Sequence, residues 1–430
     1  MGEKVSDALR FYIKTYGCQM NVRDSEKVYC ILREAGYEPV DSPDKADIVV
    51  VNSCAVREKA EGKIYSEIGR LRRMNPKARI VSMGCVAQFN HEKLRKLSSA
   101  VVGTSKIDSF YKMAHSGRFE GVYVDERMSD PDHIFPHKPS VSNFVDIMYG
   151  CNNFCSYCIV PYTRGREVSR SPKAILDEIK RLVDSGTKEV MLLGQNVNSY
   201  NALKGGFVEL LELVNGIKGL KRIRFTTSHP KDFSIELIKA MRDLDKVCEH
   251  IHLPLQSGSD RILRLMGRRY TAAEYLEKAM LFREMIPEGS ITTDIIVGFP
   301  GESDEDFRKT LQIVKTVQYD TSFSFKYSPR PLTRAAKMEG HLPEDVKLER
   351  LNELQELQAS ITQKRLKEAV GKSFEVLVEG PALKGEMMSG RNRQNVVVNF
   401  RFKDNIKEGD LVEVRITKAL KHSLVGEVSC

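Results

Sequence analysis

The stretch from Phe144 to Cys158, FVDIMYGCNNFCSYC, decides the expected fold. Its first half is typical of a short strand that ends in the turn glycine Gly150, and its second half places Cys151, Cys155 and Cys158 within eight residues. Structural zinc sites usually close with four ligands in two separated pairs, and no fourth cysteine or histidine follows at that spacing. Three thiolates that leave a fourth position open suit an iron–sulfur cluster with one free iron. We therefore predict such a cluster in this loop.

Strand-like and helix-like patterns alternate regularly after the loop. Further strands are expected at 188–193, 222–227, 250–253, 292–297 and 321–327. With the strand before the loop they give roughly six strand–helix units, which predicts a partial (β/α) barrel rather than a closed one of eight units.

The sequence before the loop predicts another α/β domain. Continuous apolar strands are expected at 11–15, 47–51 and 79–83, and helices between them indicate a doubly wound parallel sheet covered on both faces. The first of these helices is expected to open at Asp24 and to run toward Gly36.

Three domains and a linker follow from these patterns. After a charged helix, the short valine-rich strands near the C-terminus predict a small all-β barrel. We expect an N-terminal domain over 1–128, a proline-rich linker over 129–140, the partial barrel over 141–366 and the small barrel over 367–430.

A second set of cysteines is spread over the N-terminal domain. Cys18, Cys54 and Cys85 each follow one of its three expected strands. The carboxyl ends of parallel strands meet at one edge of the sheet, where such sheets build their sites. We therefore predict a second three-thiolate metal site at this edge.

Composition limits the classes of function. Of 430 residues, 41% are hydrophobic and 29% are charged, which suits a globular protein. No apolar run reaches the roughly 18 residues that span a bilayer, and no signal peptide is recognisable, so we expect a cytoplasmic protein. Nine cysteines without an export signal favour metal binding or catalysis over disulfides. A net charge of +9 permits a polyanionic partner.

The motifs carry a resemblance to known families. The loop resembles the CxxxCxxC of radical S-adenosylmethionine (SAM) enzymes, and Tyr157 holds the aromatic position before the third cysteine. The whole chain resembles the MiaB-type tRNA methylthiotransferases, and residues 367–430 resemble a TRAM domain, an RNA-binding module. The matching stretches are YGCQMN (16–21), CAVRE (54–58), VPYTRGRE (160–167), LGQNVNSY (193–200), HLPLQSGS (252–259) and TDIIVGFPGE (293–302).

The resemblance implies two [4Fe-4S] clusters and SAM. Cys151, Cys155 and Cys158 would hold the cluster that binds SAM at its open iron, and reduction would cleave SAM to a 5′-deoxyadenosyl radical. The N-terminal trio would hold the cluster that carries sulfur. One SAM would serve as methyl donor and another as radical source.

The resemblance also implies the substrate and the partners. The product would be 2-methylthio-N6-(dimethylallyl)adenosine, made from N6-(dimethylallyl)adenosine at position 37 beside the anticodon. The expected partners are the tRNA anticodon stem-loop and a flavodoxin- or ferredoxin-like electron donor, and the protein is expected to be a monomer.

Two sets of residues are expected to contact SAM and tRNA. The strand-end groups expected to hold SAM, each of which could also be ordinary turn chemistry, are Gly194, Gln195, Ser228, Gln256, Ser257 and Gly298, with Tyr157 beside the cluster. The basic residues expected to contact tRNA phosphates are Arg57, Arg164, Arg166, Lys384, Arg391 and Arg393.

Other functions stay open at this point. The same chemistry could act on threonylcarbamoyl-adenosine in tRNA or on a ribosomal-protein aspartate, although residues 18–21 and 55–58 favour the prenylated substrate. A non-catalytic iron–sulfur protein that binds RNA or transfers electrons would need clusters with four cysteines. The sequence supplies two sets of three.

Overall fold

The computed structural model describes residues 8–55, 58–125, 132–133, 137–382, 386–401 and 406–428, without the side chains of 58–61. The chain forms two compact units, and residues of the cysteine loop belong to both. The first unit comprises Met1–Lys138, Met148–Phe154 and Cys158–Arg170. The second comprises Pro139–Ile147, Cys155–Tyr157 and Ser171–Cys430. The domain boundaries expected from the sequence stay a prediction.

A six-stranded parallel sheet forms the centre of the first unit, as predicted. Its strands, in spatial order, are β2 (Glu38–Pro39), β1 (Arg10–Tyr16), β3 (Ile48–Ser53), β4 (Arg79–Gly84), β5 (Ala100–Val102) and β6 (Gly121–Tyr123). Every residue of the central strand β3 is buried, which explains its unbroken apolar pattern. The strands β2, β5 and β6 have only two or three residues each, too few to give a pattern in the sequence.

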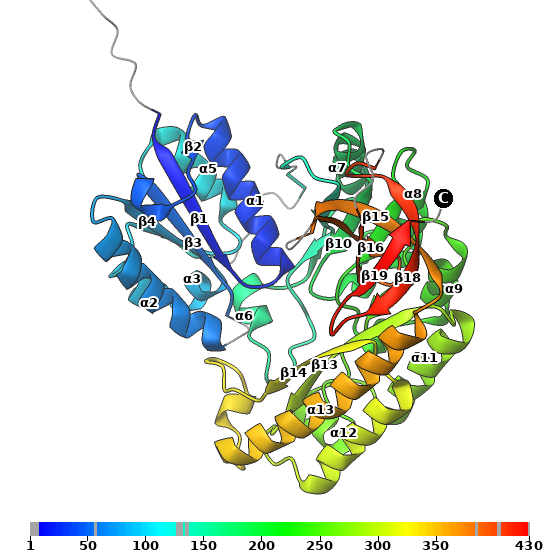
Figure 1. Ribbon diagram of the computed structural model, residues 1–430. Helices are drawn as coiled ribbons and strands as arrows, with labels where there is room; N and C mark the ends of the chain where they lie inside the picture. The colour runs from blue at the N-terminus through cyan, green and yellow to red at the C-terminus, as the bar shows by residue number, and fades with distance from the viewer. Residues whose placement is uncertain are drawn as a thin grey trace, which may run out of the picture. The chain divides into compact units, whose positions relative to one another are not determined.

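Helices cover both faces of this sheet (Figure 1). On one face, α1 (Gln19–Glu34) and α5 (Ile107–Ser116) share an apolar core with alternate strand residues such as Val50 and Val81. On the other face, α2 (Glu58–Met74), α3 (Cys85–Phe89) and α4 (His91–Arg95) pack with Val49 and Val51. Successive strand residues point to opposite faces, so one apolar strand supplies both cores.

The expected start of the first helix is wrong. Helix α1 begins at Gln19, five residues before Asp24. The polar residues Asn21, Arg23 and Asp24 are buried in its first turns, where Asn21 and Asp24 form side-chain hydrogen bonds. Helix patterns are read from apolar residues, so this polar run resembled a loop.

The first unit also contains Met148–Phe154 and Cys158–Arg170. Strands β8 (Met148–Tyr149) and β9 (Val168–Ser169) pair in antiparallel, and the short helix α6 (Val160–Arg164) lies between them in the sequence. Ile159 packs into the core that contains α3.

Six parallel strands form the partial barrel of the second unit, as predicted. They make two sheets of three, which are β11 (Arg222–Phe225), β10 (Glu189–Leu193) and β7 (Ser142–Asp146), and β12 (His250–His252), β13 (Ser290–Val297) and β14 (Thr321–Lys326). The amide of Ser228, just after β11, donates to the carbonyl of His252 (3.0 Å) and so links the two sheets.

Helices alternate with these strands along the chain. They are α7 (Pro172–Asp184), α8 (Gly206–Asn215), α9 (Ile235–Asp243), α10 (Asp260–Met266), α11 (Ala272–Met285) and α12 (Asp304–Val317). Short 3₁₀ turns of the chain lie at Pro43–Lys45, Val197–Ser199, Pro230–Asp232 and Ala335–Lys337. Side-chain caps begin several helices, and the capping box of α12 pairs Ser303 with Asp306.

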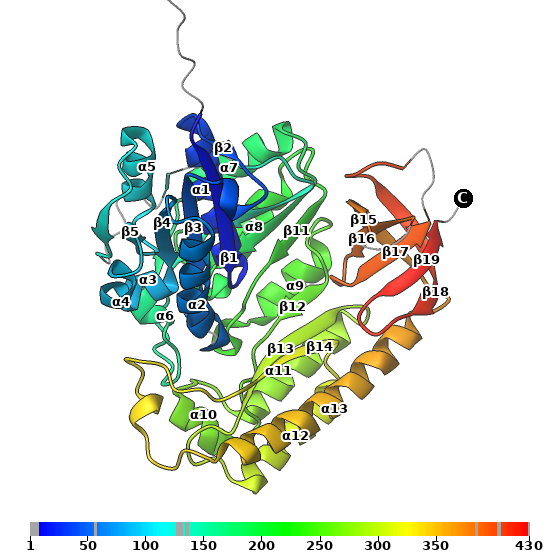
Figure 2. The same ribbon diagram turned by 60° about the vertical axis from the view of Figure 1, so that its left-hand side comes forward.

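A long helix leads to the predicted small barrel. Helix α13 (Glu344–Glu368) runs beside α12 and contacts β14 (Figure 2). The closed barrel has the order β15 (Ser373–Pro381), β16 (Met387–Asn392), β17 (Val397–Arg401), β19 (Leu424–Val428) and β18 (Leu411–Ala419). The sequence pattern missed β16, because its buried positions are Met388, Gly390 and Asn392 rather than valines.

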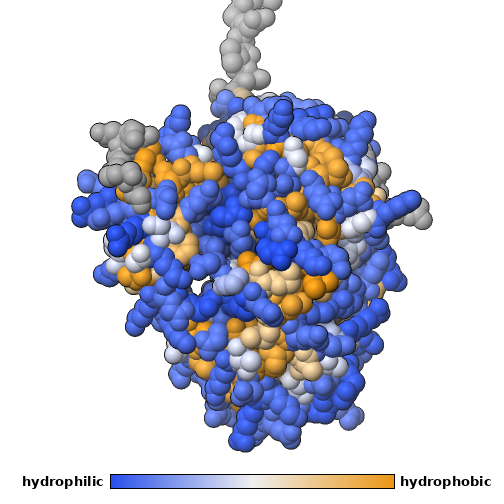
Figure 3. All heavy atoms as spheres, turned by 90° about the vertical axis from the view of Figure 1, so that its right-hand side faces the viewer, coloured by the Kyte–Doolittle hydropathy of each residue, from blue (hydrophilic) through white to orange (hydrophobic). Residues whose placement is uncertain are grey.

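The outer surface seen in Figure 3 is mostly hydrophilic, and apolar side chains gather there in small groups. In the described part of the chain, no helix is long and apolar enough to cross a membrane.

Candidate functional site

The N-terminal cysteines lie at the carboxyl ends of three neighbouring strands. Cys18 follows β1 and caps α1, Cys54 follows β3, and Cys85 follows β4 and opens α3. Strand β3 pairs with both β1 and β4, which brings the three positions to one edge of the sheet. The thiol of Cys54 lies within hydrogen-bonding reach of both other cysteines. The structure therefore brings the dispersed trio together.

The three thiols differ in their tendency to ionise. Hydrogen bonding from Cys54 lowers the pKa of Cys18 and of Cys85 against the opposing effect of burial, and the charge of Arg164 lowers both further. The same hydrogen bonds, together with burial, raise the pKa of Cys54. Thiolates are the form that binds metal, so this set of donors suits a metal site.

A buried amide network lies next to the trio. The thiol of Cys18 donates to Asn21 Oδ1 (3.3 Å), and Asn21 Nδ2 donates to Asn52 Oδ1 (3.0 Å). Asn52 Nδ2 in turn donates to the carbonyl oxygen of Asn21 (2.8 Å) and to Ser25 Oγ (2.9 Å). The network fixes the first turn of α1 against β3, and with it the position of Cys18.

Two glycines leave room for these contacts. Gly17 has φ +153°, and a Cβ at that position would lie 2.7 Å from Cys54 Cβ. Gly84 has φ +93°, and a Cβ there would lie 2.7 Å from the carbonyl oxygen of Ser53. Each glycine directly precedes a cysteine, so these close approaches allow the cysteine loops to pack together.

Arg164 is buried beside the trio. Its guanidinium forms an ion pair with Asp24 (2.9 Å), and the two side chains are only 7% and 8% exposed. Burial opposes the charge, but Cys85, Asp24 and Cys18 outweigh it and raise the pKa of Arg164. The structure thus gives Arg164 a partner inside the first unit, and the phosphate contact expected from the sequence stays a prediction.

The three cysteines of the loop lie in different surroundings. In the first unit, the amide of Cys151 donates to the carbonyl oxygen of Gly165 (3.1 Å), and Cys158 is partly exposed before α6. In the second unit, Cys155 is buried and accepts a hydrogen bond from Arg268 (3.4 Å). Nothing in the amino-acid sequence distinguishes the buried Arg268 from its exposed neighbour Arg269.

The described residues contain no three His, Cys, Asp or Glu side chains that converge as ligands of a single metal ion. A [4Fe-4S] cluster attaches its cysteines to separate irons, so its ligands need not converge on one point. Two sets of three thiols fit that kind of group better than they fit zinc. The assignment of the six cysteines as cluster ligands stays a prediction.

Three of the expected SAM contacts share an unusual property. Gln195, Ser228 and Gln256 follow the consecutive strands β10, β11 and β12, and each has a buried side-chain oxygen without a hydrogen-bond partner. Unpaired buried polar atoms are rare, because each costs about 1–3 kcal/mol. Gln256 also has φ +66°, which is uncommon for a residue with a side chain. These groups are suited to receive a polar ligand at the strand ends.

The other expected SAM contacts have protein partners. The amide of Gly194 donates to Thr226 Oγ1 (3.3 Å), and Ser257 Oγ lies 3.5 Å from Thr310 Oγ1. Tyr157 packs against the apolar cluster around Met266 and Phe299. These contacts explain the residues as parts of the fold.

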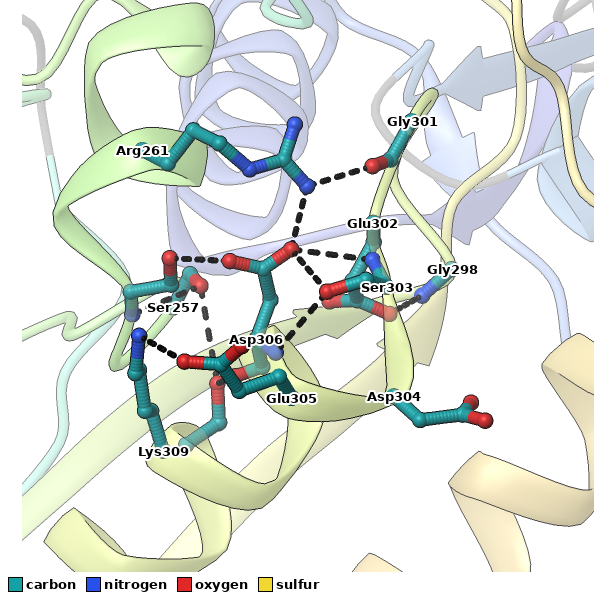
Figure 4. A network of polar contacts seen from close by, with 12 residues as sticks. Ser257, Arg261, Gly298, Gly301, Glu302, Ser303, Asp304, Glu305, Asp306 and Lys309 are labelled. Atoms are coloured by element: carbon teal, nitrogen blue, oxygen red, sulfur yellow. Dashed lines mark hydrogen bonds and ion pairs between the residues drawn. The ribbon is translucent and has the colours of Figure 1, made fainter.

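Gly298 belongs to a polar network after β13 (Figure 4). Its amide donates to Glu302 Oε2 (2.6 Å), and Arg350 forms an ion pair with the same carboxylate (2.8 Å). Asp306 accepts hydrogen bonds from Ser303 and Arg261. The network orders the loop between β13 and α12, and it accounts for Gly298 without a ligand.

The other basic residues expected to contact tRNA lie in different settings. Arg391 pairs with Glu379 (3.2 Å), and Arg393 pairs with Glu249 (2.7 Å), so both have partners within the second unit. Arg166 is exposed, with its guanidinium 4.2 Å from the centre of the Phe154 ring. Arg57 and Lys384 lie outside the described residues. Their contacts with tRNA stay predictions.

Buried arginines hold the small barrel to strand β11. Arg222 donates to the carbonyl oxygen of Arg391 (2.7 Å) and pairs with Glu375 (2.8 Å). Arg224 donates to the carbonyl oxygen of Arg393 (2.9 Å). The hairpin of the small barrel that carries Arg391 and Arg393 therefore packs against the partial barrel.

Known families match three parts of the chain. Residues 10–103 match Uncharacterized protein family UPF0004, residues 145–314 match the Radical SAM superfamily, and residues 367–429 match the TRAM domain. The solved radical S-adenosylmethionine methyltransferase TsrM from Kitasatospora setae has the same fold in part, with a TM-score of 0.57 and 14% identity over 76% of this chain and 77% of that chain.

Full-length relatives are far more similar. The tRNA-2-methylthio-N(6)-dimethylallyladenosine synthase of Thermodesulfovibrio yellowstonii is 48% identical over 425 residues, which cover 97% of this chain and 98% of that protein. The synthase of the same name from Caldicellulosiruptor saccharolyticus is 47% identical over 97% of this chain and 92% of that protein. The chain belongs to this synthase family. The resemblance to MiaB-type enzymes found in the sequence is thereby confirmed.

Arg164, beside the N-terminal trio, and Arg268, beside Cys155, were both missed as internal residues by the sequence reasoning. The only signal for Arg164 was its place in the stretch VPYTRGRE, directly after the cysteine loop.

Proposed function

We propose that the protein is a radical SAM methylthiotransferase, a tRNA-2-methylthio-N6-dimethylallyladenosine synthase. It converts N6-(dimethylallyl)adenosine at position 37 of tRNA to its 2-methylthio derivative. The observation that carries the proposal is 48% identity over nearly the full length of a synthase of this name. Two separate sets of three cysteines, rather than sets of four, support a catalytic role for both.

The proposed enzyme uses two [4Fe-4S] clusters and SAM. When bound, these groups supply three things: a sulfur atom, a methyl group, and a radical that can attack an aromatic C–H bond. Cys151, Cys155 and Cys158 would hold the cluster at which SAM binds. Cys18, Cys54 and Cys85 would hold the other.

The chain's own residues would orient these groups. The side-chain oxygens of Gln195 and Gln256 could accept hydrogen bonds from the amino group or ribose hydroxyls of SAM, and the hydroxyl of Ser228 could donate to its carboxylate. Arg164 would offset the negative charge of the thiolates at the N-terminal trio. Asn21 would hold Cys18 in place through its hydrogen bond.

The substrate would be bound as tRNA, with the small barrel acting as a TRAM-type RNA-binding module. Position 37 lies in the anticodon loop, so turning the base out of the stack costs a few kcal/mol at most. We further propose a cytoplasmic monomer that receives electrons from a flavodoxin- or ferredoxin-like donor.

The direct test uses anaerobically reconstituted protein with SAM and a reductant. We expect 5′-deoxyadenosine, and we expect the methylthio group in digested tRNA by mass spectrometry only when the tRNA carries the dimethylallyl group. A Cys155→Ala variant should abolish both products, and a Cys54→Ala variant should abolish the methylthio product alone. Absence of 5′-deoxyadenosine from the wild type would contradict the proposal.

Two alternatives share the chemistry and differ in substrate. If one of them is correct, the methylthio group should appear on threonylcarbamoyl-adenosine in tRNA, or on a ribosomal-protein aspartate, when that substrate is offered, and not on dimethylallyladenosine. The competing non-catalytic function predicts that no SAM is consumed with any substrate.

A further inference from the structure

Arg268 is a buried cation next to a cysteine of the proposed SAM-binding cluster. Its side chain donates to Cys155 Sγ (3.4 Å), and both residues are only 9% exposed. The guanidinium also donates to Tyr270 Oη (3.0 Å) and to the carbonyl oxygen of Pro254 (3.4 Å). These partners direct one edge of the guanidinium toward the sulfur.

The charge of Arg268 has no carboxylate partner among the described residues. Its hydrogen-bond acceptors there are a phenol, a carbonyl and the cysteine sulfur. A buried cation costs several kcal/mol unless an anion compensates it. A cysteine thiolate that carries an iron–sulfur cluster is such an anion, and it stands in the direction of the observed hydrogen bond.

The position of Arg268 is fixed by the chain on both sides of it. Its amide donates to the carbonyl oxygen of Leu263 in α10 (2.8 Å), so the arginine follows that helix in a defined turn. Tyr270 Oη donates to the carbonyl oxygen of Leu255 (2.8 Å) and holds the guanidinium from the other side. A side chain restrained in this way loses little entropy when it binds a ligand.

The cysteine loop is attached to the same helix end. The amide of Ser156 donates to the carbonyl oxygen of Met266 (2.8 Å), and Ser156 Oγ donates to that of Leu265 (2.8 Å). The carbonyl oxygen of Ser156 accepts from the amide of Ala335 (2.8 Å). The two hydrogen bonds to Leu265 and Met266 therefore hold the residue after Cys155 close to the helix end that precedes Arg268.

We propose that Arg268 is a positioning residue that sets the reduction potential of the cluster held by Cys155. Hydrogen bonds and positive charge at a ligand sulfur stabilise the reduced, more negative cluster and so raise its potential. A higher potential would make it easier for a donor to deliver the electron that SAM cleavage requires. This inference rests on the proposed function, because it needs a cluster at that loop.

The test is a redox titration of the reconstituted full-length protein, followed by electron paramagnetic resonance. The signal of this cluster is recognised by its change on addition of SAM. In Arg268→Met we expect the ratio of reduced to oxidised cluster at a fixed potential to fall about tenfold, which is 59 mV for a one-electron couple. In Arg268→Lys this ratio should fall less, because lysine keeps the positive charge.

Arg269→Met is the matched control, because Arg269 is the exposed neighbour in the sequence. It should titrate like the wild type. An unchanged potential in Arg268→Met would overturn the inference, even if the variant bound SAM more weakly. If Arg268→Met loses the cluster, Arg268→Gln decides, because glutamine is polar but uncharged, and an unaltered potential there would show that Arg268 is only structural. A wild type without a SAM-responsive cluster would instead contradict the proposed function.

Discussion

Replacing Arg164 by methionine tests whether this arginine serves the N-terminal trio or the tRNA. The ion pair with Asp24 measures 2.9 Å, and its side chains are 7% and 8% exposed. Arg164→Met leaves the Asp24 carboxylate buried without its cation, close to the thiols of Cys18 and Cys85. Loss of one partner from such a pair costs about 3–5 kcal/mol. We expect the first unit to lose that much of its free energy of unfolding.

Asp24→Asn combined with Arg164→Met removes both charges. This double variant should be more stable than Arg164→Met alone, because no unpaired charge is left buried. Both the single and the double variant should lose iron from the N-terminal trio, since both lack the charge of Arg164 that offsets the thiolates. Arg166→Met, on an exposed arginine two residues away, should keep both stability and iron.

Hydrogen–deuterium exchange of α1 and α6 measures the loss locally, and chemical denaturation of the apoprotein measures it overall. Iron analysis after reconstitution gives the second readout. The reasoning is refuted if Arg164→Met has the same free energy of unfolding and the same iron content as the wild type, but its binding to tRNA depends less steeply on salt concentration. That result would restore the phosphate contact predicted from the sequence.

Four further substitutions test other parts of the structure. Ser228→Ala and Gln256→Ala should each weaken the binding of S-adenosylhomocysteine three- to tenfold, because each loses about one hydrogen bond. Calorimetry measures the affinity, and the iron content should stay unchanged. Unchanged affinity would show that these residues are not part of the SAM site. Burial, with nearby positive charges, lowers the pKa of His229 to about 2 from 6.5, so only the unfolded chain takes up its proton and stability falls as pH drops below about 6.5. His229→Gln should flatten that acid dependence in denaturation curves, and an equally steep curve would contradict the assignment. Arg393→Met should speed hydrogen exchange in β16, because it breaks the pair with Glu249, and should leave the salt dependence of tRNA binding unaltered; a slope reduced by about one would instead indicate a phosphate contact.

The architecture was largely accessible from the sequence. Unbroken apolar strands such as β3 and the regular spacing of the barrel strands depend on burial that acts over whole elements, and burial leaves a periodic pattern. The convergence of Cys18, Cys54 and Cys85 on one sheet edge followed from the parallel order of the strands that precede them.

The roles of single charged residues were not accessible. Arg164 and Arg393 looked like surface cations, and only tertiary packing brings Asp24 and Glu249 to them. The partners of Arg164 and Arg393 lie 140 and 144 residues away in the sequence, and no local pattern records such a distance. The start of α1 was misplaced for a similar reason, because its polar first turn is buried against groups from distant strands.

The most direct test of two separate three-cysteine centres is the iron and sulfide content of matched triple variants. Replacing Cys18, Cys54 and Cys85 together with alanine should leave half the iron of the wild type and preserve SAM cleavage without methylthio transfer. The triple alanine variant of Cys151, Cys155 and Cys158 should also keep half the iron and should cleave no SAM. If either variant kept all its iron, or if the N-terminal variant transferred the methylthio group, two independent centres would be contradicted.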